Sequence, residues 1–290
     1  MANAAYHAPD TLEAAIGLLA ADPGARVLAG GTDLIVQHRS GRISPSAFID
    51  IKKIARLSGI RALPDGGFAI GAAVACTALL NDAALLAAWP GVVEAANLIG
   101  SVQVRNRATM GGNLCNASPA ADSVPALVAA GATCLIVGPQ GEREVAVAAI
   151  PRGPGRTSLG PGEFIAEIRL PPRSGRSGDA YLRATPRTEM DIAVAGVGVS
   201  LTLDSAGTCT AARIALGAVA PTVVLAEFAA AALIGSKLED VALDAMADAA
   251  RGVCSPIDDK RGSAAYRVHM AGVLARRAVV LAATRTGGNA

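Results

Sequence analysis

Two short segments of this sequence each place two adjacent glycines beside small polar residues. The segments consist of Ala29, Gly30, Gly31, Thr32 and Asp33, and of Thr109, Met110, Gly111, Gly112 and Asn113. Glycine permits a positive φ and a close approach of the backbone to a ligand, and successive N–H groups can then surround the oxygens of an anion. Either segment alone is also typical of an ordinary turn. The matching chemistry of the pair, with added hydroxyl and amide donors, favours a pyrophosphate held from both sides.

The usual nucleotide-binding fingerprints are absent from the sequence. Gly196-Val197-Gly198 lacks the third glycine of GxGxxG and lies in a strand-like stretch, and no GxxxxGK[ST] occurs. These two motifs are typical of dinucleotide-binding Rossmann folds and of P-loop proteins. The sequence therefore disfavours both folds.

The periodicity of apolar residues predicts an α+β chain divided by a linker. A first helix is expected to begin at Asp10 and to end at Pro23. Further helices are expected at 34–39, 77–97 with a break at 89–91, 123–130, 224–234, 238–252 and 266–283, and strands at 26–29, 68–74, 132–137, 164–170, 180–184, 192–203 and 208–216. The stretch at 171–179, PPRSGRSGD, is typical of a linker. We place a domain boundary near residue 175, which gives domains 1–175 and 176–290.

The composition excludes several classes of function. The net charge is +2 and the arginines are spread along the chain, so no clustered positive face for nucleic acid is expected. The five cysteines contain no CxxC pair, which argues against a zinc ribbon or an iron–sulfur cluster in this chain. The N-terminus lacks the features of a signal peptide and no run of 18 apolar residues occurs. We therefore expect a cytoplasmic protein.

Four segments of the chain resemble the FAD-binding medium subunits of the molybdenum hydroxylases, such as those of aerobic carbon monoxide dehydrogenase and bacterial xanthine dehydrogenase. These segments are AGGTDL (29–34), RNRATMGGNLCNASPAADSVPAL (105–127), YLRATPRTEMDIAVAGVGVSL (181–201) and GAVAPT (217–222). The resemblance covers nearly the whole chain. It implies the two-subdomain FAD-binding fold of the vanillyl-alcohol oxidase (PCMH) type, with subdomains at about 1–57 and 58–175, followed by a C-terminal domain of antiparallel sheet and helices.

The resemblance also implies roles for individual residues. Residues 29–33 and 109–113 look like the two pyrophosphate-binding loops, and Asp122 matches an acidic residue that contacts the adenosine part of FAD. Ile165 lies in a strand that approaches the flavin or the adenine, and Tyr181 lies where relatives place a ring near the isoalloxazine. Each of the last three has a simpler alternative: a helix N-cap for Asp122, a core residue for Ile165, and a residue packed between domains for Tyr181.

The flavin is expected to be bound non-covalently. In proteins of this fold a covalent link requires a His or Cys near the flavin ring. The histidines are His7, His38 and His269, and neither glycine segment contains one. Cys115, two residues after the second segment, is expected to be a buried thiol.

The function implied by the resemblance is electron transfer within a larger enzyme. A large subunit would carry the molybdopterin and oxidise the substrate, and a small subunit would carry [2Fe–2S] clusters. The present chain would pass electrons from these clusters through FAD to an external acceptor, in a dimer of heterotrimers. It would need no catalytic residue, and the large subunit would select the substrate. The alternatives are a stand-alone FAD oxidoreductase of the same fold and a nucleotide-binding module without flavin.

Overall fold

A small parallel sheet and its helices form the N-terminal part of the protein. The computed structural model describes residues 4–173 and 175–287, so that Ser174 of the predicted linker lies outside the described residues. Strands β1 (Ala5–His7) and β2 (Arg26–Leu28) both pair in parallel with β3 (Ala47–Asp50), and α1 (Leu12–Ala21) and α2 (Leu34–Arg39) complete the unit. The hydroxyl of Thr11 accepts a hydrogen bond from Ala14 N and caps α1, which begins two residues after the predicted start at Asp10.

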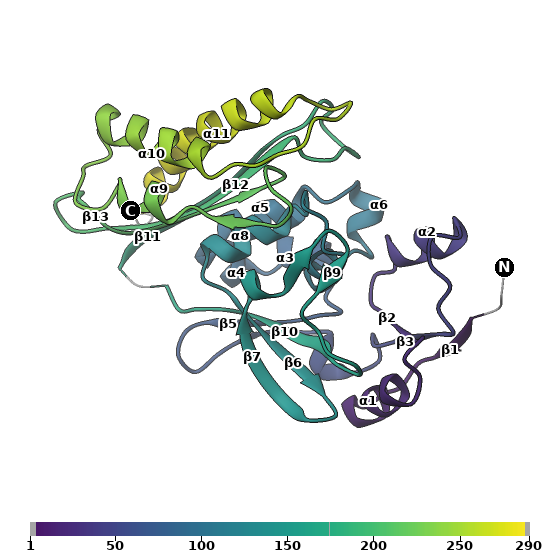
Figure 1. Cartoon of the computed structure of the whole chain (residues 1–290). Coiled ribbons are helices and arrows are strands. Elements are labelled where there is room, and N and C mark those ends of the chain that lie inside the picture. The colour runs from purple at the N-terminus through teal and green to yellow at the C-terminus, as the bar shows by residue number, and fades with distance from the viewer. Residues whose placement is uncertain (1–3, 174, 288–290) are drawn as a thin grey trace.

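An antiparallel five-stranded sheet follows, in the order β4-β5-β10-β6-β7. Its strands are β4 (Ile60–Ala62), β5 (Phe68–Gly71), β6 (Thr133–Gly138), β7 (Gly141–Ala146) and β10 (Phe164–Leu170). The helices of this unit are α3 (Cys76–Leu80), α4 (Ala83–Ala88), α5 (Pro90–Asn97), α6 (Val102–Arg105), α7 (Met110–Cys115) and α8 (Ser123–Ala129), and β8 (Pro151–Gly153) pairs with β9 (Arg156–Thr157). In Figure 1 the N-terminal unit lies to one side of this sheet.

The C-terminal part is a four-stranded antiparallel sheet between two layers of helices. Its strands are β11 (Arg176–Ala184), β12 (Ala195–Leu203), β13 (Cys209–Gly217) and β14 (Val224–Leu225), and its helices are α9 (Glu227–Ala231), α10 (Asp240–Gly252) and α11 (Ala264–Thr284). Helix α11 covers one face, while α5 and α8 of the preceding unit lie against the other (Figure 1). A Cβ on Gly198 would lie 2.4 Å from the carbonyl oxygen of Pro125, so this glycine allows α8 to approach β12.

The predicted α+β fold class is confirmed, with differences at particular elements. Helix α2 and strand β10 have the predicted bounds. The helix predicted at 224–234 begins instead as strand β14, because its first residues pair with β13, and β11 already begins within the predicted linker. Among the described residues, no helix is long and apolar enough to cross a membrane.

A buried aspartate joins the C-terminal sheet to the helices beneath it. Asp179 on β11 pairs with Arg173 and accepts a hydrogen bond from Val92 N of α5 at 3.2 Å. The Arg173 guanidinium also stacks 4.0 Å from the ring centroid of Trp89. Burial raises the pKa of Asp179 to about 6, although Arg173 opposes the shift. These contacts hold the two hydrophobic cores of the chain against each other.

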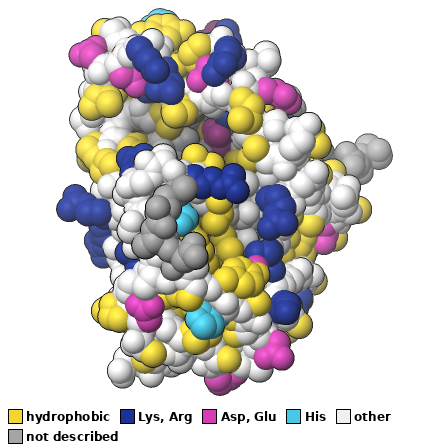
Figure 2. All heavy atoms as spheres, turned by 90° about the vertical axis from the view of Figure 1, so that its right-hand side faces the viewer, with side chains coloured by type: hydrophobic (Ala, Val, Ile, Leu, Met, Phe, Trp, Pro, Cys, Tyr) yellow, Lys and Arg dark blue, Asp and Glu magenta, His cyan; other side chains and the backbone are white. Residues whose placement is uncertain are grey.

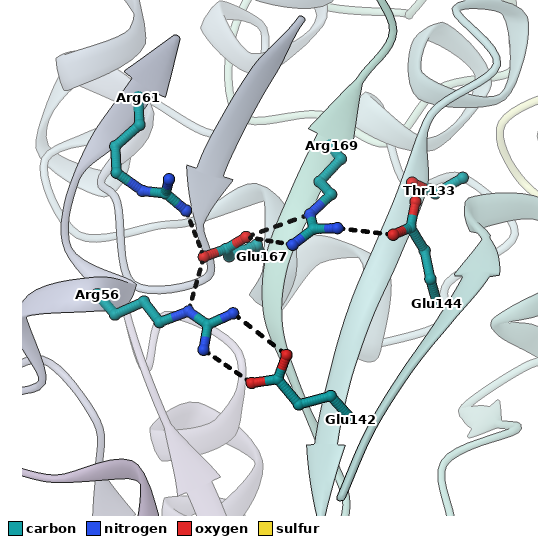
Figure 3. A network of polar contacts seen from close by, with 7 residues as sticks. All are labelled: Arg56, Arg61, Thr133, Glu142, Glu144, Glu167 and Arg169. Carbon is teal, nitrogen blue, oxygen red and sulfur yellow. Dashed lines mark hydrogen bonds and ion pairs between the residues drawn. The ribbon is translucent and has the colours of Figure 1, made fainter. Parts of the chain in front are cut away.

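A second charged cluster fixes the connection between the first two sheets (Figure 3). Glu167 on β10 is fully buried and accepts hydrogen bonds from Arg56 Nε at 2.9 Å and from Arg61 Nη2 at 2.6 Å. Arg56 belongs to the short 3-10 helix η1 (Ala55–Leu57), which links β3 to β4, and it also pairs with Glu142. Burial alone would raise the pKa of Glu167, but Arg56 and Arg61 hold it below its ordinary value. The connection is thereby tied to the five-stranded sheet.

We expect Glu167→Gln to lower the free energy of unfolding by about 2 kcal/mol, because it removes a buried charge that pairs with the three partly exposed arginines Arg56, Arg61 and Arg169. Glu142→Gln serves as the matched control, since Glu142 is exposed, and should change stability by less than about 0.5 kcal/mol. Urea unfolding at neutral pH measures both. Equal losses in the two variants would contradict this account of the cluster.

Candidate functional site

The structure brings the two glycine segments together. A Cβ on Gly30 would lie 2.1 Å from the carbonyl oxygen of Arg107 and 2.9 Å from the Cα of Ala108. Residues 107 and 108 immediately precede the second segment. The backbone of the first segment therefore lies directly against the start of the second, at a distance that only glycine allows.

The first segment forms a turn between β2 and α2 with its amides unpaired. Gly31 has φ +75° and its carbonyl accepts a hydrogen bond from Ile35 N at 3.0 Å. The four consecutive N–H groups of residues 30–33 donate to no acceptor among the described residues. Asp33 is exposed, and its side chain makes no capping hydrogen bond. A run of free amides of this kind can bind the oxygens of an anion.

The second segment is a helix, whereas the sequence predicts a loop there. Residues 110–113 form the first turns of α7, and Thr109 Oγ1 caps the helix by accepting a hydrogen bond from Gly112 N at 2.9 Å. Only Gly31 among the four paired glycines has a positive φ. Gly111 packs closely on Ala72, since a Cβ on Gly111 would lie 3.1 Å from the Cβ of Ala72, which is tighter than an ordinary van der Waals contact. Three of the four paired glycines therefore do not use the positive φ that glycine permits, and the close contacts of Gly30 and Gly111 are with other residues of the chain. A close approach of either segment to a ligand stays a prediction.

One face of α7 turns towards the N-terminal unit. Thr109, Asn113 and Asn116 follow one another at helical spacing and so lie on a common face. At one end of this face Gly30 contacts the residues before Thr109, and at the other end Gln37 Nε2 of α2 donates to Asn116 Oδ1 at 2.9 Å. The N-terminal unit thus contacts the region around α7 both at Gly30 and at Gln37.

A serine that sequence reasoning missed orients Asn113. The Oδ1 of Asn113 accepts hydrogen bonds from Ser123 N at 3.2 Å and from Ser123 Oγ at 2.7 Å. Because a backbone N–H can only donate, the carbonyl side of the amide must face Ser123. The Nδ2 group of Asn113 then points away from Ser123, and it donates to no other described residue. Ser123 is itself fully buried.

Asp122 and Tyr181 form a contact between the C-terminal sheet and α8. Asp122 occupies the N-cap position of α8, as one interpretation of the sequence has it, but its side chain makes no capping hydrogen bond. Its carboxylate accepts hydrogen bonds from Tyr181 Oη at 3.0 Å and Arg183 Nη1 at 2.7 Å. Tyr181 is 2% exposed, so its ring packs between the domains and has almost no surface left for stacking on a flavin. Burial raises the pKa of Asp122 and of Tyr181, and Arg183 opposes both shifts.

Ile165 is a core residue of β10. It pairs with Ile136 of β6 and is 3% exposed. The strand shifts register just after it, and the carbonyl of Ala166 accepts a hydrogen bond from Ala72 N at 2.9 Å. This contact places β10 beside the residue on which Gly111 packs. A role of Ile165 towards a ligand stays a prediction.

Basic side chains border the face on which the two segments meet. Figure 2 shows this side of the molecule, where Lys and Arg side chains flank a strip of apolar side chains. Arg107 is exposed, and Lys52 is partly buried beside Ala29. An apolar strip with a basic border suits a ligand that combines flat rings with phosphates.

We expect Tyr181→Phe to lower the free energy of unfolding by about 1 kcal/mol, because the buried Asp122 loses one hydrogen-bond donor. The absorption spectrum of bound flavin should be unchanged. Tyr266→Phe is the control, because Tyr266 is 47% exposed. A shifted flavin spectrum together with unchanged stability in Tyr181→Phe would instead support stacking of Tyr181 on the flavin.

Comparisons with known proteins agree with this geometry. The family described as FAD binding domain in molybdopterin dehydrogenase matches residues 2–173, and the CO dehydrogenase flavoprotein C-terminal domain matches residues 180–282. The chain is 32% identical to the putative xanthine dehydrogenase FAD-binding subunit of Escherichia coli, over 98% of each chain. It is 37% identical to the carbon monoxide dehydrogenase medium chain of Afipia carboxidovorans, over 97% of this chain and 96% of that one. A crystal structure of Cu,Mo-CO dehydrogenase in its cyanide-inactivated form matches with a TM-score of 0.93 at 36% identity, over 97% of this chain and 98% of that one.

Proposed function

Because this chain belongs to the FAD-binding subunits of the molybdopterin dehydrogenases, we propose that it is the electron-transferring subunit of a heteromeric molybdenum hydroxylase. In this proposal it takes electrons from [2Fe–2S] clusters on a partner subunit and passes them to an external acceptor. A large subunit carries the molybdopterin and binds the substrate. FAD supplies the redox chemistry when bound, since a flavin accepts and releases electrons singly or in pairs.

The observation that carries this proposal is the unpaired amide run of residues 30–33 beside α7. The N–H groups of residues 30–33, the Thr109 hydroxyl and the Nδ2 of Asn113 supply donors on two neighbouring segments of the chain. Phosphate oxygens are acceptors, so a pyrophosphate satisfies groups that otherwise lack a partner. These residues therefore fit the phosphates of a dinucleotide such as FAD.

The cysteine thiols of this chain are consistent with metal centres that lie on partner subunits. All five cysteines are free, and burial raises the pKa of Cys76 and of Cys115 to about 12. A thiol must lose its proton to bind iron, so these two are poor cluster ligands. No group of three or more metal-ligating side chains occurs among residues 4–173 and 175–287. We therefore assign the clusters and the molybdenum to partner subunits.

The two domain matches support a separate use for each part of the chain. We propose that 1–175 is the FAD-binding domain, with subdomains at about 1–57 and 58–175 that each contribute one glycine segment. The C-terminal domain, 176–290, packs on α5 and α8 through Asp179 and Tyr181. Relatives named for xanthine and for carbon monoxide match over nearly the same length. This similarity supports a chain that transfers electrons while the substrate binds to the large subunit.

We further propose assembly as a dimer of heterotrimers in the cytoplasm. The test is to purify the chain from its native host under mild conditions. We expect a yellow complex in which this chain co-elutes with one larger and one smaller subunit, and in which substrate reduces the flavin only while all three are present.

The same experiment is repeated with the isolated chain as a control. We expect it to bind FAD and to oxidise no substrate. Turnover by the isolated chain would support the stand-alone FAD oxidoreductase and contradict our proposal. A colourless chain that gains no flavin absorption when FAD is added would contradict the cofactor assignment itself.

A further inference from the structure

A lysine lies behind the first glycine segment. Lys52 follows β3, and its Nζ lies 2.9 Å from the carbonyl oxygen of Ala29 and 2.7 Å from the carboxylate of Asp50. Ala29 is the residue whose carbonyl shares a peptide unit with the N–H of Gly30. A cation beside a candidate phosphate site would ordinarily be assigned as a phosphate ligand. The contacts of Lys52 indicate a different role.

We propose that Lys52 is a positioning residue that orients the Ala29–Gly30 peptide so that the Gly30 N–H faces the phosphates of the cofactor. The inference rests on the proposed FAD function. A trans peptide is planar, and its C=O and N–H point in opposite directions. By holding the carbonyl of Ala29 on one side, Lys52 turns the N–H of Gly30 to the other. The close contact of Gly30 with Arg107 keeps this peptide in place.

The surroundings of Lys52 hold its ammonium group in position. Asp50 is 6% exposed, and it also accepts a hydrogen bond from Tyr6 Oη at 2.7 Å. Burial alone would raise the pKa of Asp50, but the hydrogen bonds from Lys52 and Tyr6 hold it below its ordinary value, so the carboxylate stays ionised at neutral pH. The backbone of Lys52 is fixed as well, since its N–H donates to Asp50 Oδ1 and its carbonyl accepts from Ser58 Oγ.

The charge of Lys52 is also largely cancelled at this position. An ammonium has three protons, and two of them are directed at Ala29 and Asp50. The paired carboxylate offsets the attraction of Lys52 for a distant anion. We therefore expect the contribution of Lys52 to cofactor binding to come from geometry rather than from its net charge.

The first test compares Lys52→Met with Lys53→Met. Lys53 is the adjacent lysine, is exposed, and has no ion-pair partner among the described residues, so it is a matched control. Titration of the apo chain with FAD should show a Kd raised about tenfold in Lys52→Met, the size expected from one lost oriented hydrogen bond to a charged group. Lys53→Met should stay within about twofold of the unchanged chain. The ³¹P resonances of bound FAD should move only in Lys52→Met.

The second test separates positioning from direct phosphate binding. In Asp50→Asn the anchor of Lys52 is weakened and a nearby negative charge is removed. If Lys52 bound the phosphates directly, this variant would bind FAD more tightly. If Lys52 positions the peptide, the variant binds FAD more weakly. The salt dependence of the Kd gives a parallel measure, because loss of a direct phosphate contact flattens it and loss of a positioning contact does not.

The outcomes distinguish this inference from the proposed function. Failure of the unchanged chain to bind FAD would overturn the proposed function. Normal FAD affinity in Lys52→Met, with the unchanged chain binding FAD, would overturn the role of Lys52 alone. Tighter binding by Asp50→Asn would likewise overturn it. If Lys52→Met does not fold, as judged by circular dichroism, the Asp50→Asn measurement and its ³¹P spectrum decide the question.

Discussion

The contact between the Gly30 backbone and the Arg107–Ala108 backbone is the constraint on which the candidate site depends. It sets the distance between a turn of the N-terminal unit and the start of α7 in the next unit. The hydrogen bond between Gln37 of α2 and Asn116, which follows α7, is a second contact between the same two units. The two segments are therefore held in a fixed relation to each other, and a ligand that bound both, as we propose, would require little reorganisation of the backbone.

Charged side chains near the two glycine segments are mostly paired with one another, so they stabilise the fold more than they attract an anionic ligand. Lys52 is paired with Asp50, Arg183 with Asp122, and Arg56 with the buried Glu167. Each pair lies behind an element that shapes the site: the first glycine turn, helix α8 and the connection between the first two sheets. The donors left for an anion are chiefly backbone amides, which hold a fixed direction and select for shape.

Sequence reasoning found the parts of the site that depend on local chemistry. The paired glycines, the helix after the first pair and strand β10 are all set by neighbouring residues, and they were predictable. The helical form of residues 110–113 was not, because the Thr109 cap and the packing of Gly111 on Ala72 decide it. Ser123 and Lys52 were missed for a related reason. Their partners, Asn113 and Ala29, lie 10 and 23 residues away in the chain, and no sequence pattern marks such pairs.

The central claim is that the two glycine segments hold a pyrophosphate, and competition between nucleotides tests it most directly. FAD and ADP contain a pyrophosphate, whereas FMN contains the flavin ring and a single phosphate. We predict that ADP displaces FAD from the apo chain competitively and that FMN binds roughly a hundredfold more weakly than FAD, since several oriented hydrogen bonds are lost. Binding of FMN as tight as that of FAD, with no displacement by ADP, would contradict the account.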